Sequence, residues 1–290
     1  MDTRQGFSVR IFLPTGEPDG LRIIGKSNWT GQGLVFPRTQ FGEARKRGEL
    51  KRAGVYVLWG PDEDDGPDED DLLPQVYVGE GEEVLSRLDQ HAKDEDKDFW
   101  THAVVFTSMD QNLNKAYVKY LEARLVAQAR EVKRAKLINE YIPKLPVLSE
   151  ADVTDADGFF RDMLLCLTVV GVNFFETVKV PEEQDLILEA KGIVARGQDT
   201  AQGFVVRINS QAVKKETNSI PDRLKKRRQF LLTQGVLEEV GTVYRLTQNY
   251  LFESSSMAAG VLLGSSINGL KVWKDSNGHT LKELRESAAR

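Results

Sequence analysis

The sequence predicts an α+β protein, in which a small mixed β-sheet is flanked by helices and followed by a smaller α/β module. Two observations predict this class. Between residues 51 and 148, short β-branched and aromatic runs alternate with stretches whose apolar residues recur at helical spacing. Beyond residue 185, further strand-like runs surround one charged helix. The 290 residues leave room for two or three compact units.

The first 50 residues are expected to form an N-terminal β-hairpin extension. Residues 8–12 alternate polar and apolar side chains, the segment EPDG at 17–20 is a turn signal, and residues 21–24 begin a return strand. The charged segment 40–50 predicts a short helix before the central domain.

The central domain, residues 51–148, is expected to contain three strands and two helices. Strands are predicted over the β-branched and aromatic runs at 54–58, 75–78 and 103–106. Helices are predicted at 82–92 and 113–134, where apolar residues fall on one stripe. The order strand, strand, helix, strand, helix favours a small sheet covered by helices.

An acidic segment separates the first two strands of this domain. Residues 61–71 read PDEDDGPDEDD, with eight acidic side chains in eleven positions, so regular structure is disfavoured. One interpretation is a solvated hairpin tip. The other is a segment that repels DNA near the site, or imitates DNA and restrains activity.

The rest of the chain is expected to be a connector, residues 149–184, and a C-terminal module, residues 185–290. The connector looks helical and then strand-like. In the module, strands at 193–194 and 204–208 precede a basic helix at 222–234 and a hairpin that turns at Gly241.

The basic helix is a candidate nucleic-acid-binding face. Its cationic residues are Arg223, Lys225, Lys226, Arg227 and Arg228, and Lys214 and Lys215 would extend the patch. The helix and the hairpin after it resemble a winged-helix arrangement, which would allow contacts with DNA phosphates. A solvated helix face explains the same residues.

Composition narrows the class of protein. The net charge is −5, which counts weakly against a nucleic-acid binder. Cys166 is the single cysteine, so no intrachain disulfide and no thiolate zinc site can form, and we expect it to be a buried small side chain. The start of the chain lacks a signal-peptide pattern, and the longest apolar stretch, residues 163–172, is too short to span a bilayer. A cytoplasmic protein without membrane contact is expected.

Several polar residues of the central domain have spacings that predict a shared site. In an antiparallel pair of strands, Tyr56 and Tyr77 can project from one face of the sheet. Arg87 and His91 are four residues apart, so they share one face of the predicted helix. Glu122 flanks the apolar stripe of the long helix.

These residues carry a resemblance to the GIY-YIG nuclease family. The segments GVY at 54–56 and YVG at 77–79 look like the two motifs that name the family. Arg87 stands eight residues after the glycine of the second motif, and His91 four residues later, as in some members. Glu122 matches the family glutamate, and Asn139 matches a later asparagine more loosely.

The chain departs from the family pattern in a few places. Val55 and Val78 replace isoleucines, a harmless change in a strand. The two motif tyrosines are 21 residues apart, a longer separation than is usual, because the acidic segment lies between them. Residues 254–284 resemble a small module found beside restriction enzymes, methylases and other nucleases.

The resemblance implies hydrolysis of a phosphodiester with one divalent cation, Mg²⁺ or Mn²⁺, on Glu122. Arg87 would bind a phosphate oxygen. Tyr56 would act as general base, with its pKa lowered by the cation and Arg87, while Tyr77 would orient water or phosphate. His91 could share the proton transfer. Which group takes the proton stays open.

Three functions are compatible with these observations. The first is a metal-dependent endonuclease acting on DNA, which the resemblance favours over RNA. The second is a non-catalytic nucleic-acid-binding or sensor component of a defence or repair complex, although pure binding would not require Glu122. The third is a protein-interaction component that uses the acidic segment. Strandedness, sequence specificity and oligomeric state are open.

Overall fold

A computed structural model describes residues 6–61, 73–94, 97–110, 112–178 and 185–288. The mixture of helices and several sheets confirms the α+β class. The described residues form two compact units, one up to residue 176 and the other from residue 177 onward. The acidic segment 61–71 lies outside the described residues, apart from Pro61.

The first unit is built on one mixed sheet of seven strands in the order β1-β2-β3-β6-β4-β5-β7. All neighbours are antiparallel except β5 and β7, which are parallel. The bounds are β1 Val9–Phe12, β2 Arg22–Lys26, β3 Gly31–Pro37, β4 Gly54–Gly60, β5 Gln75–Gly81, β6 His102–Ser108 and β7 Lys136–Leu137. The predicted central strands are confirmed as β4, β5 and β6.

The N-terminal hairpin exists, but it is not an appendage. β1 pairs with β2, and β2 pairs with β3, a strand that the sequence analysis missed. β3 in turn pairs with β6 over its full length, so the hairpin continues the central sheet. The glycines at 31 and 33 dilute the β-branched pattern of β3, which explains the omission. The helix expected at 40–50 is divided into three short turns, η1 Arg38–Gln40, α1 Phe41–Ala44 and η2 Gly48–Lys51.

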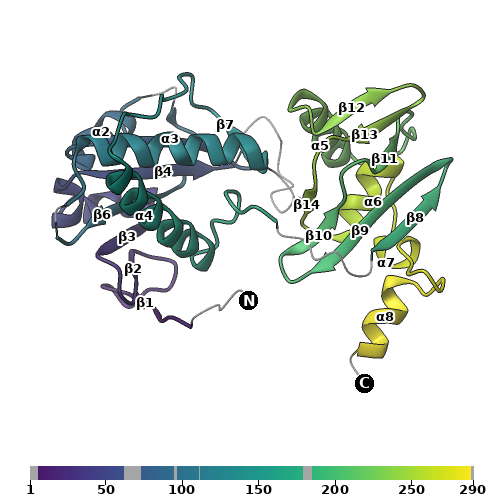
Figure 1. Cartoon of the computed structure of the whole chain (residues 1–290), viewed down its shortest axis with the longest axis horizontal. Coiled ribbons are helices and arrows are strands. Elements are labelled where there is room, and N and C mark those ends of the chain that lie inside the picture. Colours follow the sequence, from purple (N-terminus) through teal and green to yellow (C-terminus); the bar gives the residue numbers. More distant parts are fainter. Residues whose placement is uncertain (1–5, 62–72, 95–96, 111, 179–184, 289–290) are drawn as a thin grey trace. The chain divides into compact units, whose positions relative to one another are not determined.

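Helices cover both faces of this sheet. Because side chains alternate along a strand, Val55 and Val57 of β4 face a core shared with α3, Lys115–Val132, and α4, Glu150–Val169. Tyr56 and Leu58 of the same strand face a second core with α2, Val84–His91. α3 and α4 pack against each other on their side of the sheet (Figure 1). The predicted helices at 82–92 and 113–134 are thereby confirmed.

α4 corrects the expectation of a connector. Its buried residues Phe160, Met163 and Cys166 belong to the core that α3 forms with the sheet, and Phe174 and Phe175 complete that core. Residues 170–177 form no strand. The buried Cys166 has its pKa raised to about 11 by burial and by Asp162, so it is an unreactive thiol, as expected.

The second unit combines two antiparallel sheets with helices. One sheet has the order β14-β10-β9-β8 and the other β11-β13-β12. The strand bounds are β8 Leu186–Ala190, β9 Ile193–Thr200, β10 Gly203–Val206, β11 Gln211–Val213, β12 Leu237–Val240, β13 Val243–Leu246 and β14 Tyr250–Phe252. The helix bounds are α5 Asp222–Thr233, α6 Ser255–Leu263, α7 Gly269–Val272 and α8 Leu281–Ala288. α6 is buried almost throughout and, with Trp273, forms the centre of this core.

Across the described ranges, no helix combines the length and apolar character needed to cross a membrane.

Candidate active site

The register of β4 and β5 brings the two motif tyrosines to one face of the sheet. Tyr56 lies opposite Gly79, and Tyr77 lies opposite Leu58, two positions along the same strand. The ring centroids are 6.3 Å apart, which confirms the expected common face. Gly79 makes room for this arrangement, because a Cβ there would lie 2.4 Å from the Tyr56 hydroxyl.

α2 adds a histidine and an arginine to the tyrosines. His91 is buried, and its Nε2 lies 2.7 Å from the Tyr56 hydroxyl. The His91 ring also meets Tyr77 edge to face, with centroids 5.0 Å apart. Arg87, one turn earlier, is exposed, and its Nη1 donates to Gln90 Oε1 at 2.9 Å. The helical spacing predicted from the sequence therefore places both residues at the tyrosines.

Glu122 approaches from α3 as a half-buried carboxylate. Burial, and then the charge of Glu80, raise its pKa to about 7, while Arg87, Lys115 and Lys119 oppose the shift. Burial raises the pKa of both tyrosines and the negative charge of Glu122 adds to that shift, so Glu122 acts within the same electrostatic environment. Five predicted site residues thus come together: Tyr56, Tyr77, Arg87, His91 and Glu122.

The pKa of Tyr56 moves opposite to the expected direction. Burial raises it above its ordinary value of about 10, and Tyr77 adds to the shift, while Arg87 offsets only part of it. The side chains alone therefore keep Tyr56 a neutral phenol. Burial, with Lys97 and Arg87, lowers the pKa of His91 to about 4, so its imidazole is neutral near pH 7. A neutral His91 ring can accept the Tyr56 proton at Nε2.

Asn139 holds the strand rather than facing the reacting groups. Its Nδ2 donates to the Val78 carbonyl at 2.7 Å, and its Oδ1 accepts from the Val78 N–H at 3.0 Å. The side-chain amide thereby continues the parallel pairing of β5 and β7 past Leu137. We expected Asn139 to be catalytic, but the structure gives it a positioning role, because both atoms of its amide bond to the backbone of Val78, next to Tyr77.

Three charged residues of this region were missed by the sequence analysis. Lys115 Nζ lies 3.1 Å from Glu80 Oε2 and 3.8 Å from Glu82 Oε2. Lys97 Nζ lies 3.9 Å from the centroid of the Tyr77 ring. Only Glu80 could have been found from the sequence, because it directly follows the YVG segment. Lys97 and Lys115 are brought to the site by the fold.

The carboxylates suit a hard cation with oxygen ligands better than a metal that prefers imidazole or thiolate ligands. Among the described residues, no three His, Cys, Asp or Glu side chains are grouped to hold a metal ion. Mg²⁺ commonly binds through one or two carboxylates and retains several waters. Glu122 offers one such carboxylate, and burial and then the charge of Glu80 disfavour its ionised form, which a bound cation would stabilise. Glu122, with Glu80 beside it, therefore fits Mg²⁺ or Mn²⁺.

The charge of Glu122 predicts a specific pH dependence of stability. Its pKa is raised from 4.5 to about 7 in the fold, so its stabilising contribution is complete below pH 4.5 and is lost as the pH rises through 7. Glu122→Gln, which cannot ionise, is expected to be about 1–2 kcal/mol more stable than the wild type at pH 8, a figure reduced for solvent screening of the half-exposed group. Urea unfolding without metal at pH 8 and pH 4 measures the difference. The exposed Glu82→Gln is the control, and an equal gain in both variants would contradict the prediction.

The basic cluster of α5 is divided by the fold. Arg227 and Arg228 are 4% and 1% exposed. Arg227 pairs with Glu253 at 3.0 Å, and Arg228 pairs with Glu216 at 2.9 Å. They cannot contact phosphates as expected, because their guanidinium groups are enclosed and bonded. The remaining residues, Arg223, Lys225 and Lys226, are exposed, and Lys225 pairs with Asp222 at 2.8 Å.

Comparison with known families identifies part of the second unit. Residues 186–285, from the start of β8 into α8, match a family described as a domain of unknown function (DUF4357). No curated protein and no solved structure matches the chain.

Proposed function

We propose that the protein is a metal-dependent endonuclease that hydrolyses phosphodiester bonds in DNA, with its active site in the first unit. The observation that carries the proposal is the convergence of Tyr56, His91, Arg87 and Glu122 from three separate elements. Together they offer a neutral proton relay, an exposed guanidinium and a carboxylate suited to a hard cation. The choice of DNA over RNA rests on the resemblance to GIY-YIG nucleases.

Arg87 would bind the phosphate under attack. Its guanidinium is exposed, always charged and able to donate two parallel hydrogen bonds to phosphate oxygens. Negative charge grows on those oxygens as water attacks phosphorus, so a fixed cation there stabilises the transition state more than the bound substrate.

Tyr56 and His91 would remove the proton from the attacking water. Since burial holds Tyr56 in its neutral form, it can accept the water proton only as it gives its own proton to His91 Nε2, 2.7 Å away. The charge of Arg87 contributes to the low pKa of His91, and a phosphate bound to Arg87 would weaken that effect. Substrate binding would therefore make the relay more basic when it is needed.

A divalent cation held by Glu122, with Glu80 nearby, would supply positive charge to the phosphate and the leaving oxygen. Tyr77 and Asn139 would keep the site in shape. Tyr77 packs against both Tyr56 and His91, and Asn139 fixes the backbone next to Tyr77.

The proposal is tested by cleavage of labelled single-stranded, duplex and branched DNA with Mg²⁺, Mn²⁺ or EDTA. We expect the wild type to cut at least one substrate only with metal, and Glu122→Ala to lose that activity. Glu82→Ala is the matched control, because this exposed carboxylate lies next to the site and is not assigned a role in it. Binding of DNA by wild type and Glu122→Ala alike, without cutting of any substrate, would instead favour a non-catalytic nucleic-acid-binding component.

A further inference from the structure

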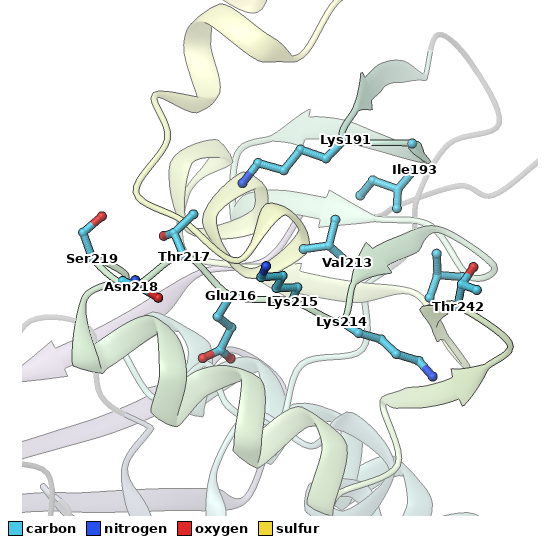
Figure 2. A pocket seen from close by; sticks show the side chains of 12 residues that line it. Lys191, Ile193, Val213, Lys214, Lys215, Glu216, Thr217, Asn218, Ser219 and Thr242 are labelled. Atoms are coloured by element: carbon cyan, nitrogen blue, oxygen red, sulfur yellow. The ribbon is translucent and has the colours of Figure 1, made fainter.

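A pocket of about 810 Å³ lies within the second unit (Figure 2). It is lined by the tip of the β8–β9 hairpin, the tip of the β12–β13 hairpin and the segment that follows β11. Lys191 and Gly192 form the first tip with positive φ angles of 52° and 77°, and Gly241, with φ 59°, precedes Thr242 in the second. Its volume falls within the range of about 300–1,000 Å³ that is usual for ligand sites.

The lining of the pocket carries uncompensated positive charge. Lys191 Nζ donates to the Leu263 carbonyl at 2.8 Å and to Ser265 Oγ at 3.0 Å, both of them neutral acceptors. Lys215 is exposed and, within the described part of the chain, has no carboxylate partner.

The other charged groups of the lining are balanced. Lys214 pairs with Glu239, and Glu216 pairs with Arg228. Two positive charges, those of Lys191 and Lys215, therefore remain to attract an anion.

The remaining lining residues are of two kinds. Thr217, Asn218 and Ser219 offer hydroxyl and amide groups at one end of the pocket, whereas Ile193 and Val213 form an aliphatic wall nearer the other end (Figure 2). Hydroxyl and amide side chains are common partners of phosphate and sugar oxygens. An aliphatic wall suits the sugar and the face of a base. Base faces are accessible in an unpaired strand, whereas in a duplex they are stacked on neighbouring bases. An elongated ligand with both phosphate and apolar parts matches this order.

We propose that this pocket binds an unpaired strand of nucleic acid, with phosphates near Lys191 and Lys215 and a sugar or base against Ile193 and Val213. The choice of nucleic acid as ligand rests on the proposed function, whereas the binding itself requires no cleavage. In this proposal the pocket, and not the buried Arg227 and Arg228 of α5, binds the phosphates in the second unit. The role of residues 186–285, which match the domain of unknown function, would therefore be to hold the nucleic-acid substrate.

The test is fluorescence anisotropy of a short labelled oligothymidylate with the full-length protein in EDTA. Lys215→Glu and Ser219→Glu each place a negative charge in the pocket at an exposed position, so the fold is expected to be retained. We expect each to raise the Kd at least tenfold, while Lys271→Glu, an exposed control elsewhere in the same unit, changes it less than about twofold. Lys215→Ala should lower the slope of log K against log salt by about 0.7, the value for one lost contact with a single strand. Circular dichroism and thermal unfolding verify the fold of each variant.

The outcomes separate this inference from the nuclease proposal. If both pocket variants bind the oligonucleotide like the wild type, the pocket inference is overturned, even where Glu122-dependent cutting is observed. If they lose binding while the wild type cuts nothing, the pocket stands and the nuclease proposal fails. If polyglutamate or a mononucleotide, at matched charge, displaced the labelled oligothymidylate as well as unlabelled oligothymidylate does, the proposal that the pocket binds a nucleic-acid strand would be overturned.

Discussion

Arg87→Ala is expected to reduce the cleavage rate by about 10²–10³-fold, because it removes the guanidinium proposed to bind the phosphate as charge develops. Arg87→Lys should also lose most of the activity, since an ammonium group cannot make the planar, two-point contact of arginine. Single-turnover cleavage with saturating enzyme and Mg²⁺ measures the chemical step separately from binding.

The control for this experiment is Arg45→Ala. Arg45 is likewise exposed and contacts the same helix, through Asp89 of α2 at 2.9 Å, but it is assigned no role at the site. We expect it to cleave at nearly the wild-type rate. Unchanged single-turnover cleavage by Arg87→Ala would show that the phosphate is bound elsewhere, and the assignment of Arg87 would be wrong.

Arg228→Ala is expected to destabilise the second unit by at least about 2 kcal/mol, because a hydrogen bond to a charged group contributes about 1.5–3 kcal/mol and this buried guanidinium makes several. Arg228 donates to Glu216 at 2.9 Å, to the Val213 carbonyl at 2.6 Å and to the Val261 carbonyl. Its loss removes the guanidinium donor from all three acceptors. Hydrogen–deuterium exchange in increasing urea, followed in peptides from residues 186–285, measures the effect within that unit.

Lys225→Ala, three positions earlier on the same helix, is the matched comparison. Lys225 is exposed and pairs with Asp222 one turn away, so its removal should leave the urea midpoint nearly unchanged. The two variants distinguish a structural arginine from a surface cation. If Arg228→Ala kept full stability and lost DNA binding, Arg228 would instead belong to the nucleic-acid-binding face predicted for this helix.

The local patterns of the sequence were sufficient for much of the first unit. Alternation along two strands predicted that Tyr56 and Tyr77 share a face, and the four-residue spacing predicted that Arg87 and His91 do. Both patterns follow from the regular repeat of a strand or helix, which depends on neighbours in the chain. The same locality explains why the glycine-diluted β3 was missed.

Partners distant in the chain decided the remainder. The amide of Asn139 is used by Val78, 61 positions away, and Arg228 is enclosed by Val213 and Val261. The direction of the Tyr56 pKa follows from burial, which no spacing in the sequence reports. The sequence by itself determined which side chains could share a face, because that depends on backbone periodicity. Only the tertiary structure decided which of them are buried, bonded or exposed, because desolvation and long-range pairing arise when the elements pack together.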